Sequence, residues 1–126
     1  MPLKTILVED SKTIRENLIP AMADLADVEV IAVAETAGEA LTLLALHASA
    51  WHLAIVDMFL REGSGLTVVR ACQAREAWQR VVVLSNYATA EIRRRCTELG
   101  ADAVFDKSNE IEAFLDYCNR MGESGS

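Results

Sequence analysis

Acids, a hydroxyl and an amine follow short apolar runs at four separate places in this sequence. Glu9 and Asp10 come after the first run, Asp57 after the third, Ser85 after the fourth and Lys107 soon after the fifth. Ligands of parallel α/β sheets collect at the carboxyl ends of the strands, where the strand order reverses. If these runs are strands of such a sheet, the five side chains meet at one edge.

Three carboxylates at one sheet edge repel one another unless a cation or a proton offsets their charge. Mg²⁺ is the predicted occupant, because it prefers one or two carboxylates, a backbone oxygen and waters. Asp10 and Asp57 suit it as direct ligands, with Glu9 acting directly or through water. Phosphoryl transfer also needs a nucleophile and donors where negative charge accumulates. Asp57 is the candidate nucleophile, since a carboxylate can form an aspartyl phosphate, and Ser85 and Lys107 are the candidate donors.

An alternation of short apolar runs with segments of helical periodicity must position these side chains. The predicted strands are residues 5–8, 28–34, 52–56, 81–84 and 103–105. Apolar residues at helical spacing follow the strands, with helices expected at 65–74 and 89–99. The run at 52–56 is nearly continuous, as in a strand covered on both faces. The pattern predicts an α/β fold, a doubly wound (βα)5 domain whose five-stranded parallel sheet has helices on both faces.

Three residues mark predicted helix ends. Thr36 is expected to cap a helix, because Glu39 three residues later resembles the second half of a capping box. Gly100 is expected to close the helix at 89–99. Asn109 is expected to cap the last helix.

Length and composition fit one domain, assigned to residues 1–121, with a flexible tail at residues 122–126. With 126 residues, 52% of them apolar, the chain can bury a core without disulfides or a structural metal. The net charge of -7 argues against a nucleic-acid partner. The sequence has no run of about 18 apolar residues, which is the length that would predict a membrane span. The 3 cysteines form no CxxC pair, and with no signal-peptide pattern they favour a cytoplasmic location.

The segments that carry these residues resemble the marker segments of response-regulator receiver domains of bacterial two-component signalling. They are Leu7-Val-Glu-Asp-Ser11, Ala54-Ile-Val-Asp-Met58 with Gly65-Leu66, Val83-Leu-Ser85, and Gly100-Ala-Asp followed by Asp106-Lys107. The resemblance covers nearly the whole chain. It implies a stand-alone receiver with the flavodoxin-like strand order 2-1-3-4-5.

Carried over residue by residue, the resemblance makes Asp57 the phosphoacceptor. Glu9 and Asp10 become the acid pair that holds Mg²⁺, Asp10 directly and Glu9 through water. The backbone carbonyl of Phe59 would be a further ligand of the metal.

The same resemblance implies a signalling switch more than a turnover enzyme. Ser85 matches the hydroxyl that moves to bind the phosphoryl group, and Lys107 matches the lysine that pairs with it. The donor would be a phosphohistidine on a histidine kinase or a histidine phosphotransfer protein, and the domain would promote its own phosphorylation and dephosphorylation. The helix at 89–99, the fifth strand and the last helix would form the surface for a downstream protein target or a homodimer.

Several positions depart from the pattern of that family. Arg61 and Ser108 stand where proline is usual, so a trans peptide bond is expected before Ser108. Val104, with Phe105 beside it, occupies the place of the aromatic residue that commonly reorients on activation. Coupling through an aromatic flip is therefore in doubt.

Bulky residues also surround the predicted site. Asn86 follows the switch hydroxyl, where a small residue is usual, and Tyr87 comes next. Together with Phe59, Tyr87 is predicted to shield the phosphoryl group from water. We therefore expect slow autodephosphorylation.

Two other functions and one other architecture stay open on the sequence. A phosphatase or phosphotransferase with true turnover would use an Asp-x-Asp pair, and Asp57-Met58-Phe59 lacks the second acid. A flavin or nucleotide binder would want a Gly-rich or Ser/Thr-rich phosphate loop after the first strand, where Glu9-Asp10-Ser11 presents negative charge. The residues could also be the receiver portion of a longer regulator with a DNA-binding domain.

Overall fold

The structure is a computed structural model that describes residues 2–124. Five parallel strands form one sheet in the order β2-β1-β3-β4-β5, which confirms the predicted order. The strands are β1 (Leu3–Val8), β2 (Val28–Ala34), β3 (Leu53–Asp57), β4 (Arg80–Ser85) and β5 (Ala103–Asp106). The order reverses at β1, which pairs with β2 on one side and β3 on the other. A ligand site is therefore expected at the carboxyl ends of β1 and β3.

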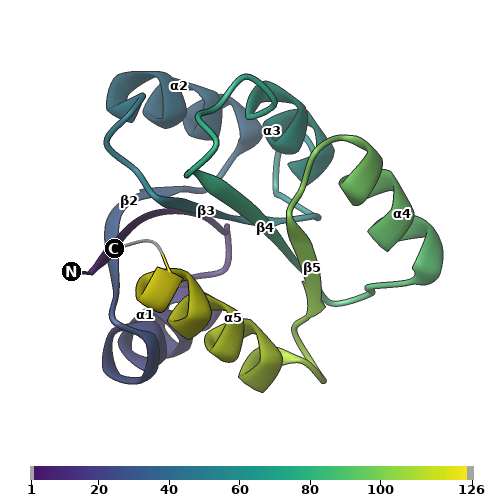
Figure 1. Ribbon diagram of the computed structural model, residues 1–126. Helices are drawn as coiled ribbons and strands as arrows, with labels where there is room; N and C mark the ends of the chain where they lie inside the picture. Colours follow the sequence, from purple (N-terminus) through teal and green to yellow (C-terminus); the bar gives the residue numbers. More distant parts are fainter. Residues whose placement is uncertain (1, 125–126) are drawn as a thin grey trace.

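Helices cover both faces of the sheet, as predicted (Figure 1). Their bounds are α1 Lys12–Ala26, α2 Ala37–His47, α3 Gly65–Ala71, α4 Ala90–Glu98 and α5 Ile111–Ser124. Helices α1 and α5 lie against one face, and α2, α3 and α4 lie against the other.

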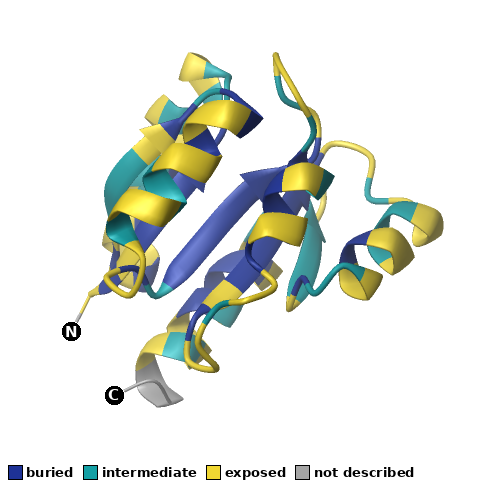
Figure 2. Cartoon of the chain, turned by 90° about the horizontal axis from the view of Figure 1, so that it is seen from above, coloured by how far each residue is buried: buried dark blue, intermediate teal, exposed yellow. Residues whose placement is uncertain are grey.

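Alternate strand residues fill two separate cores, because successive side chains of a strand point to opposite faces. Ile6 and Val56 pack on the side of α2, α3 and α4, whereas Leu7 and Ile55 pack on the side of α1 and α5. Phe114 of α5 is fully buried in the second core. All residues of β3 are buried (Figure 2). The central strand can therefore hold its last residue, Asp57, in a fixed place.

The predicted helix at 65–74 is shorter in the structure, because α3 ends at Ala71 with Cys72 at its cap. The guanidinium group of Arg75 donates to the carbonyl oxygens of Cys72 and Gln79, both at 2.9 Å. These bonds fold the chain back toward β4, so the helix stops three residues earlier than predicted.

Two of the predicted caps are confirmed. The Thr36 hydroxyl accepts a hydrogen bond from the Glu39 backbone N–H at 3.1 Å, and the Glu39 carboxylate accepts one from the Glu35 N–H at 2.7 Å. Gly100 follows α4 with a φ of 107°, a conformation that favours glycine. Local sequence thus fixes the start of α2 and the end of α4.

The prediction that Asn109 caps the last helix is wrong. Helix α5 begins at Ile111, and the acid one turn earlier organises the approach to it. The Asp106 carboxylate accepts hydrogen bonds from the N–H groups of Ser108 at 2.7 Å and Asn109 at 3.2 Å. The Asp106 carboxylate therefore organises the turn through Asn109, and the helix begins only two residues after Asn109. The peptide bond before Ser108 is trans, as predicted.

The expected tail at residues 122–126 lies only partly within the described residues. Helix α5 continues through Ser124, and residues 125–126 lie outside that part. Within residues 2–124, no helix is long and apolar enough to cross a membrane. The three cysteines are free and buried.

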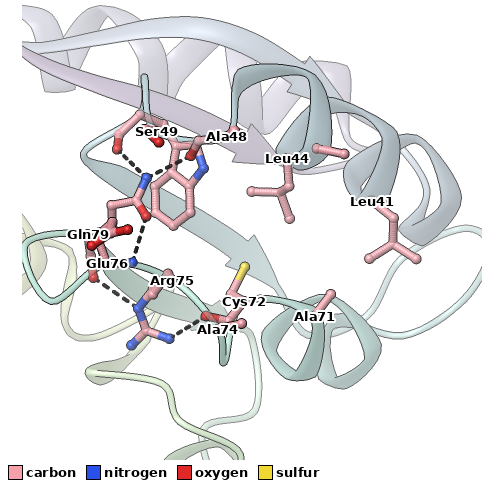
Figure 3. Close-up of a pocket in the computed structure, with 12 residues that line it drawn as sticks. Leu41, Leu44, Ala48, Ser49, Ala71, Cys72, Ala74, Arg75, Glu76 and Gln79 are labelled. Atoms are coloured by element: carbon pink, nitrogen blue, oxygen red, sulfur yellow. Dashed lines mark hydrogen bonds between the residues drawn. The ribbon is translucent and has the colours of Figure 1, made fainter.

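A pocket of about 330 Å³ lies at the amino ends of β3 and β4, between α2 and the chain that leaves α3 (Figure 3). Leu41, Leu44 and Cys72 are among its lining residues. The Gln79 side-chain amide donates to the backbone carbonyl oxygens of Ala48 and Trp51, both at 2.9 Å. Because Trp51 and Gln79 precede β3 and β4, whereas Asp57 ends β3, the pocket lies at the opposite end of the sheet from Asp57.

Candidate functional site

The three acids that the sequence singles out lie together at the carboxyl ends of β1 and β3. Val8 and Val56 are paired across these strands, so the residues that follow them, Glu9 and Asp57, are neighbours. Asp10 is next in the chain. One carboxylate oxygen from each acid lies within 4.8 Å of the others, close enough for all three to share one cation. The predicted convergence of Glu9, Asp10 and Asp57 is present.

Lys107 reaches this cluster from the segment between β5 and α5. Its ammonium nitrogen lies 2.5 Å from Glu9 Oε1 and 3.2 Å from Asp57 Oδ2. The side chains of Lys107, Glu9 and Asp57 are 8%, 3% and 7% exposed. One buried ammonium group is thus shared by two buried carboxylates, so it offsets only part of their negative charge.

Asp57 is hard to ionise in this environment. The pKa of Asp57 is raised from 3.8 to about 6: burial raises it most, the Lys107 ammonium group lowers it in part, and the negative charge of Glu9 also raises it. The Asp57 Oδ1 atom also accepts a hydrogen bond from the Phe59 N–H at 3.2 Å. A cation bound beside Asp57 would therefore favour its ionised form and lower its pKa.

Ser85 ends β4 and is fully buried. Its hydroxyl oxygen accepts a hydrogen bond from the Tyr87 N–H at 3.2 Å, and its carbonyl oxygen accepts one from the Lys107 N–H at 2.9 Å. Ser85 and Lys107 are therefore tied to each other through the backbone. In this structure the Ser85 side chain binds its own loop.

The turn after Asp57 is closely packed against the site. Phe59 forms an antiparallel bridge with Ser64, and the chain then returns so near to β3 that Gly65 has no room for a side chain. A Cβ atom at Gly65 would lie 2.4 Å from the Asp57 carbonyl oxygen. The Gly65-Leu66 pair in the sequence thus has a steric reason. The predicted metal-binding role of the Phe59 carbonyl stays a prediction.

Two aromatic rings meet at the rim of the site. Phe59 and Tyr87 are in edge-to-face contact, with ring centroids 6.5 Å apart. Phe59 is 54% exposed and Tyr87 is 71% exposed. These rings belong to the turns after β3 and β4, whose Phe59 and Tyr87 N–H groups bind the side chains of Asp57 and Ser85.

Arg15 is a site neighbour that the sequence reasoning missed. Its Nη1 atom donates to the Glu9 carbonyl oxygen at 2.8 Å, and its Nη2 atom lies 3.9 Å from the Glu35 carboxylate. Glu35 also lies 3.9 Å from Arg61, one of the residues that replace proline. The sequence offered one signal for Arg15: it lies one helical turn after Ser11, the cap of α1, and so close to the acids that precede this helix.

The fold and the site together define a class. This is a doubly wound α/β domain that holds three carboxylates and a lysine at the switch point of its sheet. A comparison with protein families matches residues 5–119 to the response regulator receiver domain. The chain belongs to this family, whose members are the receiver domains of two-component systems.

Solved structures agree with this fold. The chain is similar to the signal receiver domain of the response regulator NarL from Mycobacterium tuberculosis, with 22% identity, a TM-score of 0.77, and coverage of 93% of this chain and 96% of that chain. It is also similar to a CheX-CheY complex with BeF3 and Mg²⁺ from Borrelia burgdorferi, with 18% identity, a TM-score of 0.82, and coverage of 98% and 90%.

A third similar structure is the receiver domain of the response regulator AraT from Geobacillus stearothermophilus. The identity is 21%, the TM-score is 0.79, and the alignment covers 99% of this chain and 98% of that chain. Among curated proteins, none matches this chain. At these identities the structural likeness shows the fold, and the family match shows the class.

Proposed function

We propose that this receiver domain accepts a phosphoryl group on Asp57 in a Mg²⁺-dependent reaction and thereby switches a protein-binding surface. The donor is a phosphohistidine on a histidine kinase or a histidine phosphotransfer protein. One observation carries the proposal: oxygens of Glu9, Asp10 and Asp57 lie within 4.8 Å of one another, and the Lys107 ammonium group lies 3.2 Å from Asp57.

The acidic cluster suits a divalent cation. One ammonium group against three carboxylates leaves two negative charges, and the ligand atoms are all oxygens, which Mg²⁺ prefers. Glu9, Asp10, Asp57 and the Phe59 carbonyl would hold the ion. When bound, Mg²⁺ would offset negative charge on the phosphoryl oxygens.

The side chains of this chain supply the remaining chemistry. An Asp57 carboxylate oxygen forms a bond to phosphorus while the bond from phosphorus to the donor imidazole nitrogen breaks. The imidazole keeps the electron pair of that bond and takes up a proton. The Lys107 ammonium group and the Ser85 hydroxyl donate to the phosphoryl oxygens, where negative charge accumulates.

The product is a signal, so its lifetime matters more than turnover. In this proposal the domain promotes its own phosphorylation and dephosphorylation. The Phe59 and Tyr87 rings, in contact at the rim, limit the approach of water to phospho-Asp57. Slow hydrolysis follows from that exclusion.

The partner surface in this proposal is formed by α4, β5 and α5. In Figure 1, β5 is the edge strand beside α4 and α5, and its residues are only partly buried. A downstream protein target or a second copy of the chain would bind there. The proposed location is the cytoplasm, where buried free thiols such as Cys72, Cys96 and Cys118 stay reduced.

Intact-mass analysis after addition of acetyl phosphate tests the proposal. The wild type should gain one phosphoryl group in Mg²⁺ and none in EDTA, and Asp57→Asn should gain none under either condition. Labelling that persists in the Asp57→Asn protein would place the acceptor elsewhere. A wild type that stays unmodified would contradict the proposed chemistry.

A further inference from the structure

Arg93 of α4 makes an unusual set of contacts for a helix surface residue. Its Nε atom donates to the Ala88 carbonyl oxygen at 2.9 Å, and its Nη1 atom donates to the Val104 carbonyl oxygen at 3.1 Å. Its Nη2 atom forms an ion pair with Glu110 Oε1 at 2.5 Å. One guanidinium group thus joins the segment after β4, strand β5 and the residue before α5.

Two of these segments carry the groups proposed to bind the phosphoryl oxygens. Ala88 follows Ser85 by three residues, and Glu110 follows Lys107 by three residues. The Lys107 N–H already donates to the Ser85 carbonyl oxygen at 2.9 Å. Arg93 therefore adds a second link between the loop of the hydroxyl and the loop of the ammonium group.

Asp106 and Glu110 close this network. The Glu110 Oε1 atom that binds Arg93 also accepts a hydrogen bond from the Asp106 N–H at 2.9 Å. The Asp106 carboxylate accepts one from the Ala88 N–H at 3.4 Å and one from the Ser108 N–H at 2.7 Å. The residues on both sides of Lys107 are thus bonded to the network that includes Arg93.

The next arginine of the same helix behaves differently. Arg94 pairs with Glu98 at 3.1 Å and lies 4.0 Å from Glu91, both within α4. Its side chain is 62% exposed, against 39% for Arg93. Arg94 is therefore a matched control for Arg93, with the same charge and helix but without contacts to the two loops.

We infer that Arg93 is a positioning residue for the phosphoryl transfer, acting through Ser85 and Lys107. This inference rests on the proposed function of Asp57. By bonding Ala88, Val104 and Glu110 at once, Arg93 fixes the two loops relative to each other. The Ser85 hydroxyl and the Lys107 ammonium group can then meet the same phosphoryl group. Donors act best when held in place before reaction, because their reorganisation then adds little to the barrier.

The test measures the rate of Asp57 phosphorylation by acetyl phosphate as a function of Mg²⁺ concentration. Arg93→Gln should lower the maximal rate by about ten- to a hundredfold, the upper figure being the loss that a misplacement of about 1 Å caused from outside the reacting groups can produce. The half-saturating Mg²⁺ concentration should stay that of wild type, because Arg93 touches none of the three acids. Arg94→Gln should match wild type in both. Glu110→Gln, a milder change, should lower the maximal rate in the same direction.

A Ser85→Ala background separates positioning from general stability. If Arg93 acts through Ser85, Arg93→Gln should cost much less in that background than in wild type, because coupled residues are not additive. Equal losses in both backgrounds, or an Arg93→Gln rate at or above that of wild type, would overturn the inference alone. A wild type that takes up no phosphoryl group would overturn the proposed function and this inference with it.

Discussion

Replacing Asp57 by asparagine should stabilise the folded domain in metal-free buffer at neutral pH. The structure buries the Asp57 carboxyl beside Glu9, with one ammonium group shared between them, and burial raises the pKa of Asp57 from 3.8 to about 6. Asn keeps the size of the side chain and removes the charge. The variant therefore avoids the cost of a buried negative charge that Mg²⁺ would otherwise offset.

The size and sign of the effect follow from proton binding. Because the folded state holds the Asp57 proton more tightly than the unfolded chain, this carboxyl group lowers the free energy of unfolding as pH rises from about 4 to about 6. Each pH unit between the two pKa values corresponds to about 1.4 kcal/mol. The advantage of Asp57→Asn should thus be small near pH 4, grow as pH rises toward about 6, and reach on the order of 3 kcal/mol above pH 7.

Urea unfolding in EDTA, followed by tryptophan fluorescence, measures this difference at several pH values. Trp51 is buried and reports loss of the fold. The control is Asp116→Asn, the same change at an exposed position of α5. Added Mg²⁺ should stabilise the wild type by about 1.4 kcal/mol at ten times its dissociation constant, and Asp57→Asn by less. An Asp57→Asn protein no more stable than wild type at pH 7.5, or a difference independent of pH, would refute the reasoning.

Three further predictions concern packing, water access and thiol reactivity. Gly65→Ala should lower the free energy of unfolding by about 1–3 kcal/mol, because its Cβ would lie 2.4 Å from the Asp57 carbonyl oxygen; thermal unfolding that matches wild type would contradict this steric account. Tyr87→Ala should speed the loss of the phosphoryl group from Asp57, measured by intact mass over time, and an unchanged lifetime would argue against shielding. Burial raises the pKa of Cys72 to about 11 and of Cys118 to about 12, so a thiol reagent at pH 8 should modify them only after unfolding; fast labelling of the native protein would contradict their burial.

Strand ends were the most predictable part of this chain. The apolar runs that precede Glu9, Asp57 and Ser85 are short and rich in β-branched residues, as in strands covered on both faces, and parallel strands bring their ends to one edge. Thr36 was predictable for a related reason, because a cap and its partner acid are three residues apart. In both cases the determining interactions are local, or follow from the sheet topology.

Individual contacts of side chains that reach across the fold were less predictable. The sequence placed Lys107 at the edge of the acids, but not its ion pair with Glu9 in particular, across 98 positions of sequence. Arg93 was not predictable, because it binds carbonyl oxygens whose positions depend on how α4 lies beside β5. A long, charged side chain is usually a solvated surface group, and nothing in the neighbours of Arg93 marks an exception. The pKa of Asp57 is equally a product of burial, which requires the assembled site. For Asn109 the local signal existed, but the Asp106 carboxylate holds Ser108 and Asn109 in the preceding turn, and the helix begins at Ile111.

Val104 stands where the family commonly has an aromatic residue, and the two faces of the sheet decide whether the neighbouring Phe105 can act in its place. Val104 packs on the side of α4, whereas Phe105 points to the other face, where its ring contacts Phe114 of α5 with centroids 5.9 Å apart. Because alternate strand residues face opposite ways, Phe105 could take the place of Val104 only by a one-residue shift of β5. Such a shift would break the pairing of Ser85 with Asp106, and with it the alignment of the two phosphoryl-binding loops. The hydrogen bonds of Arg93 to Ala88, Val104 and Glu110 provide a link between these loops and α4 that needs no ring.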